Sequence, residues 1–70
     1  MIAIKIQDAE IPTIVMVETQ GKTQKEIMQE IVTNTENTQG PISIYADKNI
    51  PWIYSLLEYC IDSNIELATV

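Results

Sequence analysis

The sequence predicts a two-layer α+β domain, in which two helices cover one face of a mixed four-stranded sheet in the order ββαβαβ. Two stretches of the 70 residues carry the three-to-four-residue spacing of amphipathic helices, and four carry the alternation or β-branched composition of strands. Residues 41–70 have the length of a strand–helix–strand unit, whose two strands are expected to be parallel neighbours.

The first two strands are expected near the amino end. Ile2, Ile4 and Ile6 alternate with more polar residues, which predicts a half-buried strand. Residues 7–10 are polar and are expected to form a turn. Pro12 suits the start or edge of the second strand because it cannot donate a ladder hydrogen bond. Residues 14–17 are apolar on both faces, so this strand is either covered on both sides or lies against a partner chain. Val15 and Val17 are therefore candidate partner contacts.

The first helix is predicted from its start signal. Thr23 and Glu26 have the spacing of a capping box, in which each side chain accepts a hydrogen bond from the other residue's N–H. An apolar stripe follows, formed by Ile27, Met28, Ile31 and Val32. Residues 33–40 are poor in helix formers and are expected to hold the end of the helix and a loop.

The third strand, second helix and fourth strand follow in residues 41–70. Ile42, Ile44 and Ala46 share one face of a strand, and Pro51 suits the first turn of a helix. The expected stripe of that helix consists of Ile53, Leu56, Leu57, Cys60 and Ile61. Asn64 tolerates the left-handed conformation that commonly ends helices, and residues 66–70 are expected to form the last strand.

Composition excludes several classes of function. The chain has ten acidic and four basic residues, a net charge of −6, and neither Arg nor His. A nucleic-acid binder needs a basic stripe, so that role is not expected. No serine has a histidine to activate it and no glycine-rich phosphate loop occurs, so neither an enzyme nor a cofactor or metal site is expected. Cys60 is expected to be a buried, inert thiol.

The stretch from Ile44 to Trp52, Ile-Tyr-Ala-Asp-Lys-Asn-Ile-Pro-Trp, resembles the Ala-Asp-Lys-x-[Val/Ile]-Pro-aromatic signature of the ExbD/TolR family. The signature positions here are Ala46, Asp47, Lys48 and Pro51. The family is the periplasmic part of proton-driven envelope motors, and its signature also lies between a strand and a helix. This sequence has Ile53 and Asn64 where the family usually has glycine.

The resemblance implies a single domain, residues 1–70, that acts as a periplasmic interaction and dimerisation module of a biopolymer transport component. It implies a homodimer, an ExbB/TolQ-like stator, a TonB- or TolA-like partner and, as in TolR-like members, a peptidoglycan contact. The single membrane helix of the family is not seen in this sequence, so the chain is expected to be a soluble fragment of an inner-membrane protein. Strand addition to an open sheet edge is the expected mode of recognition.

For Tyr45, for Trp52 and for the pair Asp47 and Lys48, the sequence leaves two possible roles open. Tyr45 is expected to point away from the helices, where it contacts a dimer partner or a ligand. Trp52 either packs on a neighbouring strand or anchors a partner. Asp47 and Lys48 follow a strand and precede a helix, where they either form a capped turn or bind an anion.

Two other classes of function fit the predicted fold. One is a dimeric small-molecule-sensing regulatory module, with its ligand near Asp47 and Lys48 at the end of the third strand. The other is a purely structural dimerisation domain of a larger cytoplasmic protein.

Overall fold

The computed structural model of the chain describes residues 1–7, 11–36, 38 and 40–70. Its elements in chain order are β1 (Ile2–Ile6), β2 (Thr13–Val17), α1 (Gln24–Thr35), β3 (Ile42–Ala46), α2 (Ile53–Asp62) and β4 (Glu66–Thr69). All six elements were predicted, in this order. Most of the turn expected over residues 7–10 lies outside the described residues.

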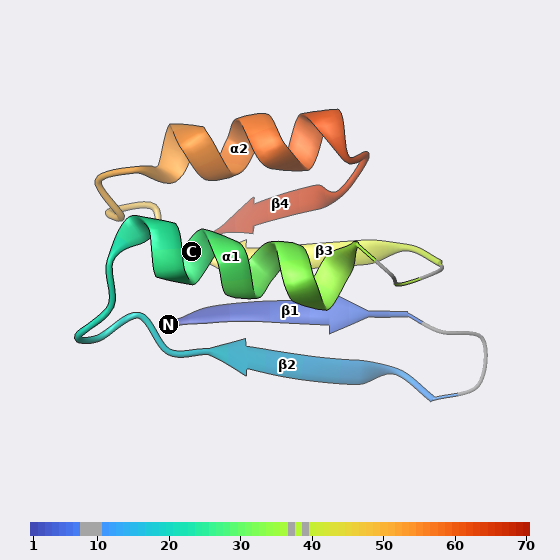
Figure 1. The fold of residues 1–70 in the computed structure, drawn as a ribbon. Coiled ribbons are helices and arrows are strands. Elements are labelled where there is room, and N and C mark those ends of the chain that lie inside the picture. The colour runs from blue at the N-terminus through green and yellow to red at the C-terminus, as the bar shows by residue number, and fades with distance from the viewer. Residues whose placement is uncertain (8–10, 37, 39) are drawn as a thin grey trace.

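The four strands form one mixed sheet in the order β2-β1-β3-β4. Strand β1 is antiparallel to both of its neighbours, and β3 and β4 are parallel. Both helices lie on one face of the sheet, with α1 over its centre and α2 alongside β4 (Figure 1). The two-layer α+β fold is therefore confirmed, as is the parallel pairing of the strands that flank α2.

The register of the strands decides which side chains face the helices. Ile4 lies opposite Ile44 across the antiparallel pair, and Ile44 lies beside Leu67 across the parallel pair. Paired residues point to the same face, so the isoleucines of β1 and β3 form one apolar layer. Ile27 and Ile31 of α1 and Leu56 and Cys60 of α2 close the core above it.

The helices begin as their sequences indicate, with one shift. Thr23 and Glu26 form the predicted capping box at the start of α1. Helix α2 begins at Ile53 with Trp52 as its N-cap, so Pro51 lies in the turn before the helix and not in its first turn. Asn64 has φ +57°, the left-handed conformation that the sequence predicted for the end of this helix.

The predicted stripe of α2 was partly wrong. Leu56 and Cys60 are buried, but Leu57 is 37% exposed and Ile61 is 68% exposed. The helix is turned so that the half-buried Tyr59 packs against the core, and its hydroxyl lies 2.7 Å from that of Thr35. Because Tyr59 takes the flank next to α1, Leu57 and Ile61 are displaced to the opposite flank.

The two residues of β2 predicted as partner contacts, Val15 and Val17, lie on the helix side of the sheet. Val17 lies opposite Ile2 and is buried, and Val15 packs against the core on the same side. The outward-facing residues of this strand are Ile14 and Met16, which are 62% and 53% exposed. Pairing with β1 decides this, because the side chain opposite Ile2 must share its face.

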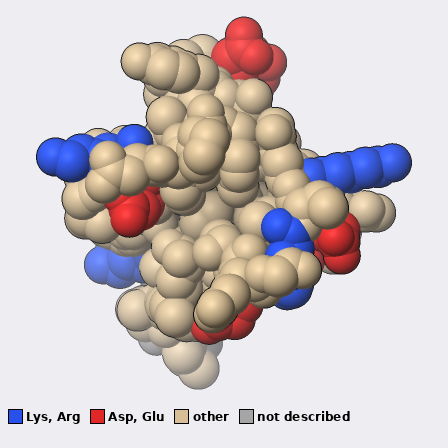
Figure 2. All heavy atoms as spheres, turned by 90° about the vertical axis from the view of Figure 1, so that its left-hand side faces the viewer, with Lys and Arg blue, Asp and Glu red and all other residues tan. Residues whose placement is uncertain are grey.

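The first and last residues of the chain lie at the same end of the sheet (Figure 1). Figure 2 shows that lysine and acidic side chains are scattered around this end and do not gather into a patch of one sign. Within the part of the chain that the structure describes, neither helix has the length and apolar character needed to cross a bilayer.

Candidate functional site

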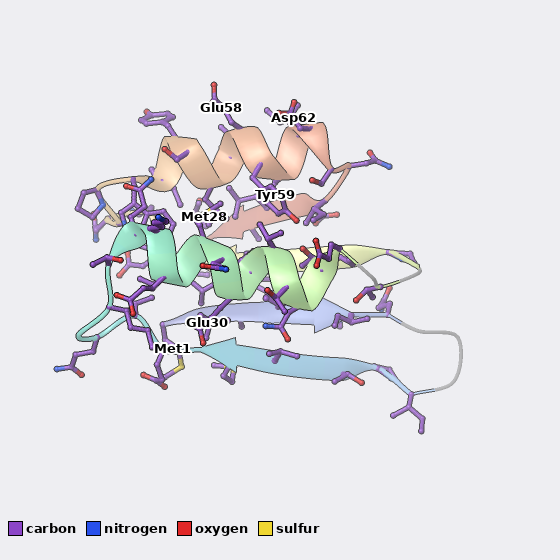
Figure 3. The ribbon with its side chains drawn as sticks, in the orientation of Figure 1. Met1, Met28, Glu30, Glu58, Tyr59 and Asp62 are labelled. Carbon is purple, nitrogen blue, oxygen red and sulfur yellow. The ribbon has the colours of Figure 1, made fainter. Side chains whose placement is uncertain are left out.

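Helix α2 presents a second apolar stripe that the core does not use. Tyr54, Leu57 and Ile61 are 78%, 37% and 68% exposed. Their spacings of three and four residues place them on one side of the helix. Leu57 and Ile61 are each two residues from Tyr59, and a separation of two residues corresponds to a rotation of about 200° around the helix. Figure 3 shows Tyr59 on the side of α2 toward α1, so the exposed stripe lies on the flank above β4.

A groove lies between this stripe and the last strand. It has a volume of about 370 Å³ and is lined by Lys48, Ile53, Tyr54, Leu57, Leu67 and Thr69. We call it the α2–β4 groove. Its walls are mostly apolar, and it is open along the side of β4 that has no neighbouring strand. A side chain of moderate size could enter between Leu57 and Leu67.

The outer edge of β4 offers main-chain groups beside the groove. The N–H of Val70 donates to the carbonyl of Ala46, and the carbonyl of Val70 accepts from the N–H of Lys48. Residue 70 therefore bonds inward to the β3 side. Along a β-strand, the N–H and C=O groups of successive residues point to opposite sides of the strand. The N–H and C=O of Leu67 and Thr69 therefore point away from β3. These two residues also line the groove with their side chains.

Charge differs between the two ends of the groove. Lys48 lines the end next to the start of α2. Asp62, at the end of α2, is exposed toward the other end. Figure 3 shows Glu58 and Asp62 projecting from the outer side of α2. An extended ligand with a positive group at the acidic end and a negative group at the lysine end would match this arrangement.

The opposite edge of the sheet lacks these features. A hollow beside the first half of α1 is lined by Lys22, Glu26, Gln29 and Glu30. Lys22 and Glu30 form an ion pair there, with 2.9 Å between Nζ and Oε2. Among the described residues, α1 contributes no large exposed hydrophobic side chain, whereas α2 contributes three. The β4 edge is therefore the better candidate for binding an apolar segment.

The residues of the signature turn have local structural roles. Ala46 is buried, and Pro51 is exposed. The Oδ1 atom of Asp47 accepts a hydrogen bond from the N–H of Asn49 at 2.9 Å, which is the capped-turn alternative. The N–H of Lys48 donates to Val70 at 3.3 Å, so the turn also holds the end of β4. Of the four residues, Lys48 alone lines the α2–β4 groove.

The structure does not bring the predicted partner contacts together. Val15 and Val17 face the helices, while Tyr45, which is 38% exposed, lies on the other face of the sheet. Trp52 is half-buried and packs against the core, in agreement with the packed alternative. The groove was missed because the exposed side of α2 had been assigned to the core.

Another hollow lies at the far end of the sheet from Asp47 and Lys48. It has a volume of about 530 Å³, and its lining includes Thr35, Tyr59 and Asn64. The described residues contain no group of three His, Cys, Asp or Glu side chains that could hold a metal ion. Burial raises the pKa of the Cys60 thiol to about 11, so this thiol is protonated and unreactive near neutral pH.

Comparison with known proteins returned no match: no family model, no curated protein and no solved structure is significantly similar to this chain.

Proposed function

We propose that this chain is a protein-interaction domain that binds an extended segment of a partner by adding it as a fifth strand at the outer edge of β4. The main observation in support of the proposal is that Leu67 and Thr69 combine two features. Their main-chain groups point to the open edge, and their side chains line the α2–β4 groove. Main-chain pairing supplies affinity in such complexes, and pockets for alternate side chains supply specificity.

Helix α2 would cover the added strand. Tyr54, Leu57 and Ile61 lie on the flank of α2 above the position next to β4. A segment with apolar residues at every second position would place them against this stripe and in the groove. Burial of the exposed stripe would contribute about 25 cal/mol for each Å² of apolar surface removed from water.

The charge of the domain favours a basic partner segment. The net charge is −6, and Asp62 is exposed toward one end of the groove. Exposed charges of this kind act more on the association rate than on the final affinity, and salt weakens their effect. We therefore expect the partner segment to carry lysine or arginine next to its apolar residues.

The wider role that we propose is similar to that of the periplasmic domain of the ExbD/TolR family. The resemblance of residues 44–52 to the family signature supports it, together with a two-layer fold that places this stretch between a strand and a helix. In this role the domain is a homodimer on the outer side of an inner membrane. It serves an ExbB/TolQ-like stator and a TonB- or TolA-like partner, with peptidoglycan as a further contact.

A short peptide tests strand addition. The probe is the synthetic peptide Lys-Lys-Val-Thr-Val-Thr-Val, and its control has proline in place of the central valine, which removes one N–H donor. We expect the probe to slow hydrogen exchange of the Leu67 and Thr69 amides by about tenfold at saturation, and the control to have a much weaker effect. Unchanged exchange of both amides at saturating peptide would contradict the proposal.

Two variants test the part played by α2. Leu57→Gln should weaken binding of the probe peptide by about tenfold, because it removes the apolar wall of the groove. Ser55→Gln introduces the same side chain on an exposed position about 200° away around the helix, and it should leave binding unchanged. Equal affinities for the two variants would mean that the groove is not the binding site.

A small-molecule-sensing module is the second candidate, because the groove has the volume of a small ligand site and Lys48 at one end. An anionic ligand bound there would shift the NMR resonances of Lys48 and Tyr54 without protecting the β4 amides from exchange.

A further inference from the structure

Among the residues that the structure describes, no helix or strand covers the face of the sheet opposite the helices, and this face carries a row of four neutral residues. The row runs across all four strands as Met16, Ala3, Tyr45 and Ala68, because these residues are paired in register. Met16 is 53% exposed and Tyr45 is 38% exposed, although both are large. Large and small side chains alternate along the row.

A second row lies beside the first on the same face. It runs as Ile14, Lys5, Ser43 and Glu66. Ile14 is 62% exposed and extends the apolar surface of Met16 along β2. Lys5 and Glu66 lie on different strands of this row, β1 and β4, and carry opposite charges. The second row therefore adds no net charge to the face, although the whole chain has a net charge of −6.

We infer that this open face is the contact surface of a homodimer, in which two copies pack sheet against sheet about a two-fold axis parallel to the strands. The axis passes between β1 and β3, the two central strands. This operation exchanges β1 with β3 and β2 with β4 of the second copy. The contact is isologous, so each pair of facing residues occurs twice.

The first row is complementary to itself under this operation. Tyr45 faces Ala3 of the second copy, and Met16 faces Ala68 of the second copy. Each large side chain therefore meets a small one, which allows the two faces to interdigitate as packed sheets do at a separation of about 10 Å. A two-fold axis perpendicular to the strands through this row would instead place tyrosine on tyrosine and methionine on methionine.

The second row brings opposite charges near each other, and it places Ile14 opposite Glu66 of the second copy. Lys5 faces Ser43 of the second copy, and Glu66 of that copy is one strand away. The separation of adjacent strands is about 4.8 Å, which a lysine side chain can span. Two ion pairs thus accompany the apolar row, and they oppose the repulsion between two acidic chains.

This inference deepens the homodimer that belongs to the proposed function and rests on it. The contact leaves both β4 edges and both α2–β4 grooves free, because they lie at the edge and on the helix side of the sheet. A dimer of this kind could bind two partner segments at once.

Crosslinking of paired cysteine variants tests the geometry. Met16 and Ala68 lie on the two edge strands, three strand spacings or about 14 Å apart in one chain. In the inferred dimer they face each other. The double variant Met16→Cys, Ala68→Cys should therefore form a covalent dimer with a thiol crosslinker of about 10 Å span. Each single variant should stay monomeric on a denaturing gel, and Cys60 does not interfere because it is 1% exposed.

The single variants separate this dimer from edge-to-edge dimers. A covalent dimer formed by Ala68→Cys alone would indicate pairing of two β4 edges, and one formed by Met16→Cys alone would indicate pairing of two β2 edges. Either result would overturn the inference, and so would the absence of any covalent dimer. A covalent dimer seen with the double variant only would support it.

Matched lysine substitutions separate the dimer from the groove. Met16→Lys should raise the dissociation constant of the dimer by about tenfold or more, measured by analytical ultracentrifugation, and leave peptide binding unchanged. Ile61→Lys introduces the same charge on α2 and should weaken peptide binding while the dimer persists. If Met16→Lys and the unmodified chain have the same mass at every concentration, the inference is wrong even where peptide binding succeeds.

Discussion

The hydroxyl oxygens of Thr35 and Tyr59 lie 2.7 Å apart and join the last turn of α1 to the second half of α2. Thr35 is buried, and its hydroxyl also lies 2.8 Å from the carbonyl of Ile31, to which it donates. Since a threonine hydroxyl has one proton, Tyr59 is the donor in the contact between the helices. This hydrogen bond fixes the rotation of α2 and so determines which of its apolar residues face solvent.

Removal of this donor should destabilise the domain. We expect Tyr59→Phe to lower the free energy of unfolding by about 1 to 2 kcal/mol, because Thr35 loses a partner in a buried position. Tyr54→Phe is the control, since Tyr54 is 78% exposed. Urea denaturation followed by circular dichroism measures both. Equal stability of the two variants would mean that the contact between the hydroxyls contributes nothing.

Two adjacent leucines should respond differently to the same substitution. Leu56 is fully buried, so Leu56→Ala should cost about 2 to 5 kcal/mol and could abolish cooperative unfolding in so small a domain. Leu57 is 37% exposed on the groove side, so Leu57→Ala should cost less than about 1 kcal/mol. Thermal unfolding of the two variants tests which side of α2 faces the core. A Leu57→Ala variant less stable than Leu56→Ala would contradict the orientation described here.

The end of α2 depends on the left-handed conformation of Asn64. Its φ of +57° strains any residue that carries a Cβ and lacks a compensating local hydrogen bond. Asn64→Ala should therefore lower the free energy of unfolding by about 1 kcal/mol. Asn64→Gly should leave it equal or slightly higher, because glycine adopts this conformation freely. Chemical denaturation of the three proteins gives the comparison, and an alanine variant as stable as the glycine variant would be inconsistent with this conformation.

Stability at alkaline pH should reflect the Cys60 thiol. Burial raises its pKa from 9.0 to about 11, so the folded state holds this proton more tightly than the unfolded state. The unfolded chain loses the proton first as pH rises, so stability should fall between about pH 9 and pH 11, by up to about 2 to 3 kcal/mol.

Comparison with Cys60→Ala isolates this effect. The alanine variant is less stable at pH 7 because it leaves a small cavity, but it has no thiol to ionise. The difference in unfolding free energy between the two proteins should shrink as pH increases from 8 to 11. A constant difference over that range would show that the thiol titrates normally in the folded state.

Much of the fold was predictable because local signals and tertiary packing agree. The alternation of Ile42, Ile44 and Ala46 specifies one buried face, and the capping box of Thr23 and Glu26 specifies where α1 begins. These features depend on residues a few positions apart. The parallel neighbours β3 and β4 followed from the length of the connection between them.

The surfaces proposed for binding were less predictable because they depend on residues far apart in the sequence. Strand β2 is apolar on both faces, and only its pairing with β1 shows that Val17 is inside and Met16 outside. Helix α2 has more apolar residues than one stripe can hold. The contact of Tyr59 with Thr35 determines that Leu57 and Ile61 remain outside, and it involves residues 24 positions apart.

The placement of both termini at one end of the sheet has a mechanical consequence. A force applied between them would pull β1 and β4 apart across β3, at right angles to the strands and along the hydrogen bonds. Such a load breaks the backbone pairs in succession and not all at once. The domain should therefore yield by unzipping at low tension when stretched end to end.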